Sequence, residues 1–301
     1  MNFYINNYSN SSGPTIFAYR LKNSLENQGI QFSEDSNNRI SVVTGPYFKG
    51  KNNILRLDGL YLDSGNRLGN SKYLNAPIFE CYEKFDHIVF QSEYAKNVYE
   101  AFTNTERPHS IIYNGVEDIF FSNKESIDKP EGFEKVVIAS SKWRRHKRIE
   151  ECIEAFKDNR LKDVALVILG GYQQVDMKNV FCLPMIPPKD LPKYYKMADA
   201  MIHLCWLDCC PNSVVEGLAS GLPVICSHNG GTKELVKNDG VVIELEEDYE
   251  YGEMVDLYQP PKVDINVIVE GVLKVLDMPK IQERKDLKIT ETSLQYINLF
   301  K

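Results

Sequence analysis

Two carboxylates, Asp208 and Glu216, flank a stretch of chain that can bind an anion. Seven residues separate them, and Asn212 and Ser213 after a proline form a helix-start signal. The first backbone N–H groups of a helix have no partner inside it, so those of Ser213 and Val214 are expected to face outward and attract negative charge. A carboxylate about one turn along, as at Glu216, suits a pair of ribose hydroxyls. The spacing predicts a phosphate site between two carboxylates.

A basic cluster upstream supplies the matching positive charge. Residues 141–148 read Ser-Lys-Trp-Arg-Arg-His-Lys-Arg and lie between an apolar strand at 136–139 and a helix at 148–158. Most charge runs are simply solvated faces. This one stands where a parallel strand ends, which is where α/β sheets bind their ligands. Together with the helix tip after Asp208, its position favours a diphosphate over a solvated face.

Short apolar runs alternate with amphipathic stretches along the chain, a pattern typical of parallel sheets covered by helices. Strands are predicted at 2–5, 40–43, 53–57, 87–90, 110–113, 136–139, 164–169, 200–204, 223–226 and 240–243. Helices are predicted at 15–28, 92–102, 148–158, 212–220, 232–237 and 264–277, and a long loop at 58–75. Residues 117–134 interrupt this rhythm as a linker does. Two doubly wound α/β domains in tandem are the simplest arrangement.

The composition excludes several classes of protein. With 301 residues, 43% hydrophobic and 26% charged, the chain has ordinary globular values and room for about two domains. A net charge of −7 argues against a nucleic-acid partner. No apolar run reaches the ~18 residues that span a bilayer, and no secretory leader is visible. Peripheral contact with a membrane stays open.

Seven cysteines, an odd number, lie mostly in apolar segments. This is typical of free thiols in a reducing compartment, so a cytoplasmic location is predicted. Cys205, Cys209 and Cys210 are clustered but lack paired Cys-x-x-Cys spacing. No Asp-x-Asp pair is present either, so no metal site is predicted.

The second half of the chain resembles the donor-binding domain of retaining GT-B glycosyltransferases, the family 4-like clan that includes glycogen and sucrose synthases. The family's Glu-x7-Glu motif corresponds to Asp208 and Glu216, with Asp in place of the Glu that contacts the donor sugar. Its Gly-Arg-Leu motif with a following Lys corresponds to residues 141–143 and Lys147. The resemblance implies that Lys142 and Lys147 hold the donor diphosphate.

Weaker motifs extend the resemblance. The family's strand ending in Val-Gly-x-Gly is similar to the one that ends at Gly170 and Gly171, and its base-contacting loop maps onto residues 183–185, including Met185. Asn114 begins a turn, Asn-Gly-Val-Glu, that resembles the Asn-Gly-Val-Asp turn closing the family's first domain.

Two residues of the first half match less closely. Gly13 resembles the glycine-rich turn that approaches the diphosphate from across the cleft, although an ordinary strand-to-helix turn explains it equally well. Asp58 stands where relatives carry the histidine of a Thr-x-His motif. It would assist the acceptor hydroxyl or stabilise positive charge on the sugar; the alternative is a cap on the following turn.

The resemblance implies a GT-B fold, two Rossmann-like domains facing across a cleft, with a reduced N-terminal domain. The predicted parts are an acceptor-side domain at 1–118, a linker at 119–133, a nucleotide-sugar domain at 134–280 and a C-terminal helix at 281–301 that packs back on the first domain.

The implied reaction is transfer of a hexose from a UDP- or GDP-sugar to a hydroxyl of a glycan, lipid-linked or protein acceptor, with retention and without metal or other cofactor. The implied catalytic residues are Lys142, Lys147, Asp208 and Asp58. The implied donor-binding residues are Gly13, Gly170, Gly171, Met185, Asn212, Ser213, Val214 and Glu216. The oligomeric state stays open.

Two alternatives remain at this stage. One is a non-catalytic subunit that binds a nucleotide sugar or a partner transferase, and the other is a sugar epimerase or phosphorylase on the same fold. A dinucleotide-dependent dehydrogenase is excluded, because no Gly-x-Gly-x-x-Gly follows any predicted strand.

Overall fold

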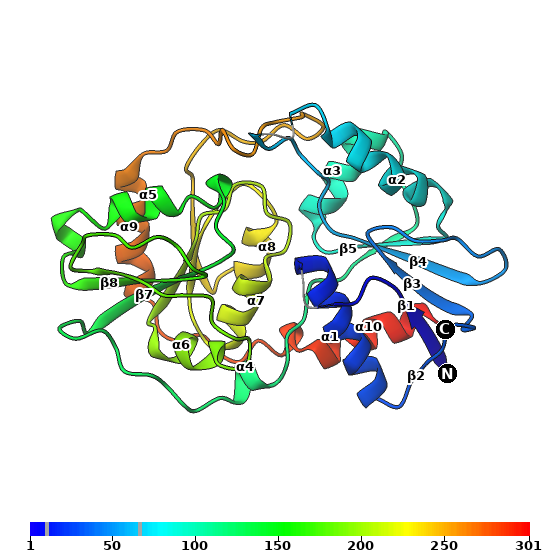
Figure 1. The fold of residues 1–301 in the computed structure, drawn as a ribbon, viewed down its shortest axis with the longest axis horizontal. Coiled ribbons are helices and arrows are strands. Elements are labelled where there is room, and N and C mark those ends of the chain that lie inside the picture. Colours follow the sequence, from blue (N-terminus) through cyan, green and yellow to red (C-terminus); the bar gives the residue numbers. More distant parts are fainter. Residues whose placement is uncertain (10–11, 66–67) are drawn as a thin grey trace.

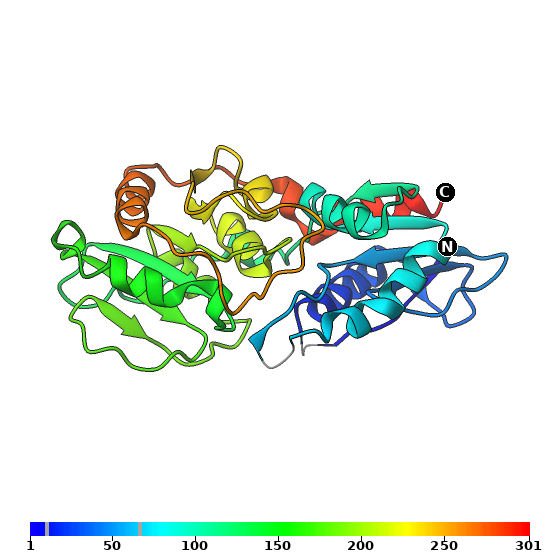
Figure 2. The ribbon, with the colours of Figure 1, turned by 90° about the horizontal axis from the view of Figure 1, so that it is seen from above.

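The computed structural model describes residues 1–9, 12–65 and 68–301, which form two lobes, each built on a six-stranded parallel sheet (Figures 1 and 2). The first sheet has the order β2-β1-β3-β4-β5-β6. Its strands are β1 (Asn2–Ile5), β2 (Gln31–Phe32), β3 (Asn38–Val42), β4 (Asn52–Leu57), β5 (His87–Phe90) and β6 (His109–Ile111). The second has the order β12-β11-β10-β7-β8-β9. Its strands are β7 (Lys135–Ser140), β8 (Val164–Leu169), β9 (Val180–Cys182), β10 (Ala200–His203), β11 (Val224–Ser227) and β12 (Gly240–Ile243).

Helices cover these sheets in both lobes. The first lobe has α1 (Gly13–Asn27), α2 (Ser71–Lys84) and α3 (Glu93–Thr103), and the one-turn helix α4 (Ile119–Ser122) follows it. The second has α5 (Ile149–Ala155), α6 (Leu191–Met197), α7 (Asn212–Ala219), α8 (Thr232–Val236) and α9 (Ile265–Leu276), and α10 (Ile289–Leu299) ends the chain. None of the described helices is long and apolar enough to cross a bilayer.

The local sequence explains where the main helices begin. Ser12 and Thr15 form a reciprocal capping box ahead of α1, whose apolar residues at spacings of four turn inward to the first sheet. Ser92 accepts the Ala95 N–H at 3.1 Å and caps α3 in the same way. These caps fix the residues at which α1 and α3 begin.

Two parts of the sequence prediction needed correction. The loop expected at 58–75 is shorter, because α2 begins at Ser71. This helix was missed because Pro77 lies inside it and several polar residues surround its start. Strands β2 and β9 and helix α6 were also not predicted, since they have two, three and seven residues and carry little periodic signal.

The end of the chain returns to the first lobe. Helix α10 lies beside α1 (Figure 1), where the Ser24 and Ser293 hydroxyls are 2.9 Å apart. The ring of Tyr296 is fully buried, with its centroid 6.4 Å from that of Phe17. An isolated bridge joins Val116 to Lys288. The core of the first lobe therefore includes residues from the far end of the chain.

A long connection crosses between the lobes at another point. The strap, residues 244–264 between β12 and α9, runs over to the loop that precedes α2 (Figure 1). There Asp63 and Asp256 form an isolated parallel bridge, and the Leu257 N–H donates to the Asp63 carbonyl at 2.8 Å. Three residues of the second lobe, Trp206, Leu207 and Cys209, lie in an apolar cluster with α2 and α3.

We expect Tyr296→Ala to lower the free energy of unfolding by about 3–5 kcal/mol, as for other large aromatic side chains removed from a core. Leu294→Ala, on the same helix but exposed, should change it by no more than about 0.5 kcal/mol. Urea unfolding followed by fluorescence gives both values. Equal losses for the two variants would show that α10 is not part of the core of the first lobe.

Candidate functional site

A cavity of about 520 Å³ lies between the lobes, at the carboxyl ends of their strands. Its walls include most of the residues singled out in the sequence. From the second lobe come Lys142, Lys147, Asp208, Asn212 and Ser213, and from the first come Gly13 and Asp58. The parallel topology explains this meeting, because both sheets present their carboxyl edges to the same space.

Lys147 and Asp208 form the central ion pair of the cavity. The Lys147 ammonium lies 2.5 Å from the Asp208 carboxylate, and both side chains are mostly buried. Burial raises the pKa of Asp208, but Lys147 and His203 outweigh it and hold that pKa far below the usual value. Burial lowers the pKa of Lys147, yet Asp208 raises it further than burial lowers it. Both groups are therefore charged at neutral pH.

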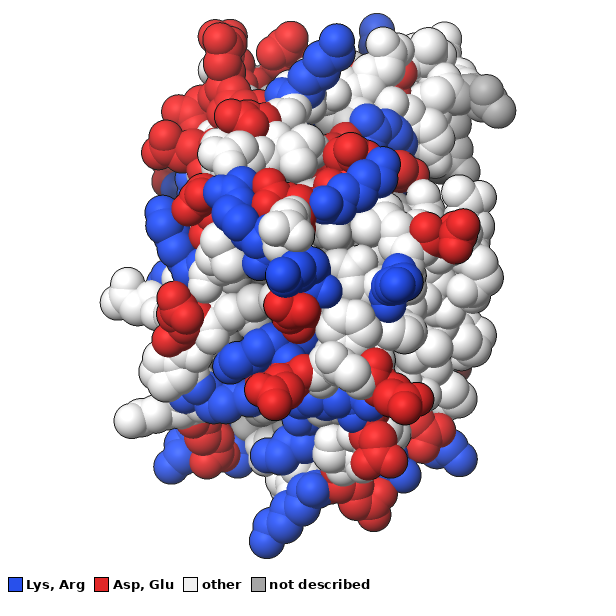
Figure 3. All heavy atoms as spheres, turned by 90° about the vertical axis from the view of Figure 1, so that its left-hand side faces the viewer, with Lys and Arg blue, Asp and Glu red and all other residues white. Residues whose placement is uncertain are grey.

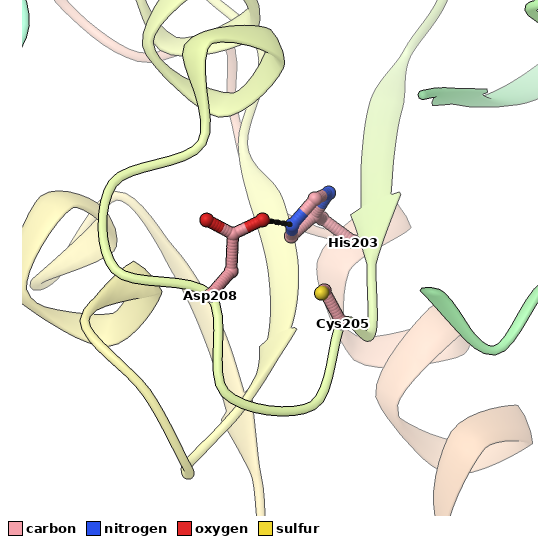
Figure 4. Close-up of side chains that lie close together, drawn as sticks. All are labelled: His203, Cys205 and Asp208. Atoms are coloured by element: carbon pink, nitrogen blue, oxygen red, sulfur yellow. Dashed lines mark ion pairs between the residues drawn. The ribbon is translucent and has the colours of Figure 1, made fainter. Parts of the chain in front are cut away.

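His203 and Cys205 lie close to Asp208 (Figure 4). The imidazole Nε2 of His203 is 3.7 Å from the carboxylate, and burial lowers the pKa of this histidine, so the ring is neutral. Ligand atoms of the three residues lie within 4.8 Å of one another, close enough to hold a cation. The Lys147 ammonium already supplies the positive charge there and would repel a metal ion.

The first turn of α7 closes more tightly than the sequence analysis expected. The Val214 N–H is not free but donates to the Pro211 carbonyl at 3.0 Å, and the Val214 side chain is buried in the core. The Pro211 carbonyl accepts from Val214 at 3.0 Å and also from Val215 at 3.2 Å, so the first turn carries a 3₁₀-type bond and engages one amide more than an α-helical turn alone would. The N–H groups of Asn212 and Ser213 have no hydrogen-bond partner in the described part of the chain, and both residues line the cavity.

Glu216 does not line the cavity. Its carboxylate accepts a hydrogen bond from Arg20 Nη2 of α1 at 2.8 Å and another from the Tyr195 hydroxyl at 3.2 Å. Burial raises the pKa of Glu216, and Arg20 opposes that shift. The Arg20 Nε also lies 3.0 Å from Glu117 in the turn after β6. Each oxygen of the Glu216 carboxylate can accept two hydrogen bonds, and Arg20 and Tyr195 use one on each.

Asp58 is paired with a buried arginine. The guanidinium of Arg56, fully buried, contacts the Asp58 carboxylate, donates to Asn114 Oδ1 at 2.5 Å and to Gln91 Oε1 at 3.2 Å, and stacks over the ring of Phe17. Burial raises the pKa of Asp58 against the opposing effect of Arg56. The second oxygen of Asp58 is buried without a hydrogen-bond partner among the described residues.

The remaining predicted residues lie outside the cavity wall. Gly170 has a φ of +108°, and a Cβ there would lie 2.0 Å from the Ser141 carbonyl, so glycine lets β8 pack under the basic loop. The Trp143 indole donates to the Leu169 carbonyl at 2.9 Å and holds that loop in place. Gly171 pairs with Leu183 through its backbone, and Met185 nearby is exposed.

Only part of the basic cluster faces the cavity. Arg145 pairs with Glu151 at 2.6 Å, and the buried Arg148 with Glu246 at 3.0 Å. Lys142 lines the cavity, is exposed, and has no ion-pair partner within the described ranges. Elsewhere on the second lobe, basic and acidic side chains are interspersed over the face that Figure 3 shows.

Sequence reasoning missed several cavity residues. His146 is buried beside Lys147, and burial followed by the charge of Lys147 lowers its pKa to about 3, so this imidazole is neutral. Gln91 and Asn114 line the cavity from the carboxyl ends of β5 and β6. Both residues follow closely after predicted strands, and this position could have indicated that they face the cavity. Tyr61 lines the cavity from the loop before α2.

The prediction that most cysteines are buried free thiols is confirmed. All the cysteines are free thiols, and all but the half-buried Cys81 are buried. Burial raises the pKa of the Cys205 thiol to about 12, so it stays protonated beside Asp208.

Comparisons of the sequence place the chain among known proteins. A family model described as glycosyl transferases group 1 matches residues 121–289. The chain is 28% identical to spore coat protein SA of Bacillus subtilis (strain 168) over 127 residues, 40% of this chain and 30% of that protein. It is 26% identical to an uncharacterized glycosyltransferase of Methanocaldococcus jannaschii over 207 residues, 62% of this chain and 52% of that protein. The match thus spans about half or less of the length of these curated relatives.

Solved structures with the same fold cover nearly the whole chain. A sucrose-phosphate synthase from Thermosynechococcus elongatus has a TM-score of 0.68 at 14% identity over 99% of this chain and 98% of that one. Anabaena HepE in complex with UDP-glucose has a TM-score of 0.62 at 13% identity over the same shares. WaaG, a glycosyltransferase of lipopolysaccharide biosynthesis, has a TM-score of 0.58 at 13% identity over 99% and 95%. These likenesses confirm the predicted GT-B fold.

The family model begins in α4 and ends at the start of α10, so it contains the whole second sheet with Lys147, Asp208 and α7. It covers more than half of the chain, and the resemblance read from the sequence is confirmed: the protein belongs to the glycosyl transferases group 1 family.

Proposed function

We propose that the protein transfers a hexose from a nucleoside diphosphate sugar, with UDP or GDP as the nucleotide, to an acceptor hydroxyl with retention at the anomeric carbon. The observation that carries this proposal is the cavity in which Lys142, the Lys147–Asp208 pair and the open N–H groups of Asn212 and Ser213 face one another. Two ammonium groups and a helix N-terminus form a site for a diphosphate.

The chemical difficulty of the reaction is the departing diphosphate. The bond between the anomeric carbon and the phosphate oxygen breaks with its electron pair on the phosphate, while the acceptor oxygen bonds to the same face of the carbon. The acceptor proton passes to the released phosphate oxygen. Lys142, Lys147 and the α7 tip stabilise the growing negative charge where it develops, and Asp208 orients the sugar beside them.

Asp58 faces the same space from the first lobe. Its buried, unpartnered carboxylate oxygen is positioned to accept a hydrogen bond from the acceptor hydroxyl or to face positive charge on the sugar ring. Gln91 and Asn114 hold the Arg56 guanidinium, and Arg56 contacts the other oxygen of Asp58, so Asp58 is held in one orientation before substrate binds.

The nucleotide would extend from the diphosphate toward Gly171 and Met185, with the ribose hydroxyls near Glu216. Because Glu216 is buried behind the cavity wall and is paired with Arg20, this contact requires the Arg20 side chain to shift when the donor binds. HepE, which shares the fold, was solved with UDP-glucose, and this supports a uridine nucleotide as the donor to test first.

A non-catalytic nucleotide-sugar subunit and an epimerase or phosphorylase predict different products. Incubation with labelled UDP-, GDP- and ADP-sugars separates the three: transfer or slow hydrolysis with retention supports the proposal. Binding with neither reaction would favour the non-catalytic subunit, and a rearranged sugar nucleotide an epimerase.

A UDP- or GDP-sugar should raise the melting temperature of the protein, because a ligand at 100 times its dissociation constant adds about 2.7 kcal/mol to the free energy of unfolding.

Lys142→Ala should lower turnover about 100-fold or more, because it removes one of the positive charges that stabilise the leaving diphosphate. Lys147→Ala should lower turnover by a similar factor for the same reason. Lys162→Ala, an exposed lysine outside the cavity, is the control. No thermal shift with any sugar nucleotide would contradict the proposal.

Glu216→Gln should weaken donor binding by roughly 10- to 150-fold, the value of a charge-assisted hydrogen bond of about 1.5–3 kcal/mol. Titration calorimetry with the sugar nucleotide that raises the melting temperature measures this loss of donor affinity. Since the change also leaves Arg20 with Glu117 alone, unfolding by urea is followed in parallel. A folded variant with unchanged donor affinity would remove Glu216 from the nucleotide site.

Transfer should proceed without a divalent metal, because Lys142 and Lys147 already supply the positive charge that the diphosphate needs. The rate in excess EDTA is expected to equal the rate in untreated buffer. Loss of transfer in chelator, with recovery on adding Mn²⁺, would show that a metal ion takes part.

A further inference from the structure

The side chain of Asn114 joins the two lobes at the wall of the cavity. This residue lies in the turn after β6 of the first lobe, is buried, and lines the cavity. Its Nδ2 donates to the Cys210 carbonyl at 3.1 Å and to Asn212 Oδ1 at 2.9 Å, both in the second lobe. These two acceptors flank Pro211, from which α7 begins. Asn114 therefore holds the first turn of α7 from the other lobe.

The oxygen of the same amide contacts the group that holds Asp58. Asn114 Oδ1 accepts from Arg56 Nη2 at 2.5 Å, and the fully buried Arg56 guanidinium contacts the Asp58 carboxylate. A guanidinium can only donate and a backbone carbonyl can only accept, so Arg56 and Cys210 fix which way the Asn114 amide points. A chain of side-chain contacts thus runs from Asp58 in the first lobe to Asn212 in the second.

A second amide holds Arg56 but does not span the lobes. Gln91 Oε1 accepts from Arg56 Nη2 at 3.2 Å, and within the part of the chain that the structure describes it forms no hydrogen bond to the second lobe. Of these two amides, Asn114 is therefore the one that connects Arg56 to α7.

The two ends of this chain of contacts have different tasks in the proposed reaction. Asp58 faces the acceptor, and the backbone N–H of Asn212 faces the diphosphate. Transfer with retention brings the acceptor oxygen to the face of the anomeric carbon from which the phosphate oxygen departs. A misplacement of about 1 Å between reacting groups can cost about 100-fold in rate. The separation of the two ends therefore matters for the chemical step.

We propose that Asn114 is a positioning residue that holds the Asp58 carboxylate and the tip of α7 at a fixed separation across the cavity. This inference rests on the proposed function, because the groups that it spaces are assigned there to the acceptor and to the donor diphosphate. Loss of the amide should slow the chemical step and leave donor binding nearly unchanged, since Lys142 and Lys147 keep their charges at the cavity wall.

The test measures hydrolysis of labelled UDP-glucose, in which water takes the place of the acceptor, and binding of UDP by titration calorimetry. GDP-glucose and GDP replace them if only a GDP-sugar raises the melting temperature. Asn114→Ala should lower kcat roughly 10- to 100-fold and change the Kd of the nucleotide by no more than about 3-fold. Asn114→Ser should lose kcat as well, because one hydroxyl donates a single hydrogen and cannot serve both acceptors.

Asn179→Ala is the matched control for loss of a buried amide. Asn179 of the second lobe donates to the Phe156 carbonyl at 3.0 Å and to the Leu161 carbonyl at 3.3 Å, and it lies outside the cavity wall. This variant should lose stability in urea, as Asn114→Ala does, but keep the unaltered kcat. Equal losses of kcat in the two variants would show a general structural effect and contradict the positioning role.

A double-mutant cycle with Asp58→Ala tests whether the two ends are connected. Asn114→Ala should lower kcat by a much smaller factor in the Asp58→Ala background than in the unaltered protein, because no carboxylate is left to place. Equal factors in both backgrounds, or an unaltered kcat in both Asn114 variants, would overturn the inference. Neither nucleotide binding nor hydrolysis in the unaltered protein would instead overturn the proposed function, and this inference with it.

Discussion

A guanidinium buried between the lobes sets their relative position. Arg20 of α1 reaches Glu216 of α7 at 2.8 Å and Glu117 at 3.0 Å. Burial lowers the pKa of Arg20, but the two carboxylates raise it by more, so the charge is kept. Removing one partner of such a pair leaves a buried charge, which costs about 3–5 kcal/mol. This cost opposes any rotation that separates α1 from α7, and α1 and α7 both begin at the cavity.

A second contact acts on the other side of the cavity. Glu234 of α8 accepts the backbone N–H groups of Glu93 and Tyr94 at 2.8 and 2.7 Å, so the second lobe caps the N-terminus of α3 in the first. The carboxyl edges of the two sheets are thus held facing each other by charge at both sides. Within that frame Asp208 holds the Lys147 ammonium at the wall of the cavity, and Lys142 lines the same wall without an ion-pair partner among the described residues.

The fold and the second-lobe half of the site could be predicted because their signals are local. Apolar runs mark the strands, and in a parallel sheet the residues just after each strand meet at one edge, which brings Lys147 to Asp208. The pairing of Arg56 with Gln91 and Asn114 could not be read, because three strands must first align. The hydrogen bond between Arg20 and Glu216 depends on how the two lobes dock. The spacing of residues along the sequence carries no information about that docking. The amide of Val214 was misjudged because the first turn of α7 contains a 3₁₀-type bond, which engages one amide more than the α-helical pattern assumes.

The first lobe owes much of its structure to chain that follows the second sheet. Helix α10 supplies Tyr296 and Ser293 to its core beside α1, and the strap supplies the edge that pairs with Asp63. Neither segment contributes a residue to the wall of the cavity. A small first lobe can therefore leave its strand ends open to the cavity, since the packing that a larger lobe would provide for itself comes from the C-terminal part of the chain. The core of the first lobe is therefore incomplete until α10, which follows the second sheet in the chain, has packed against it.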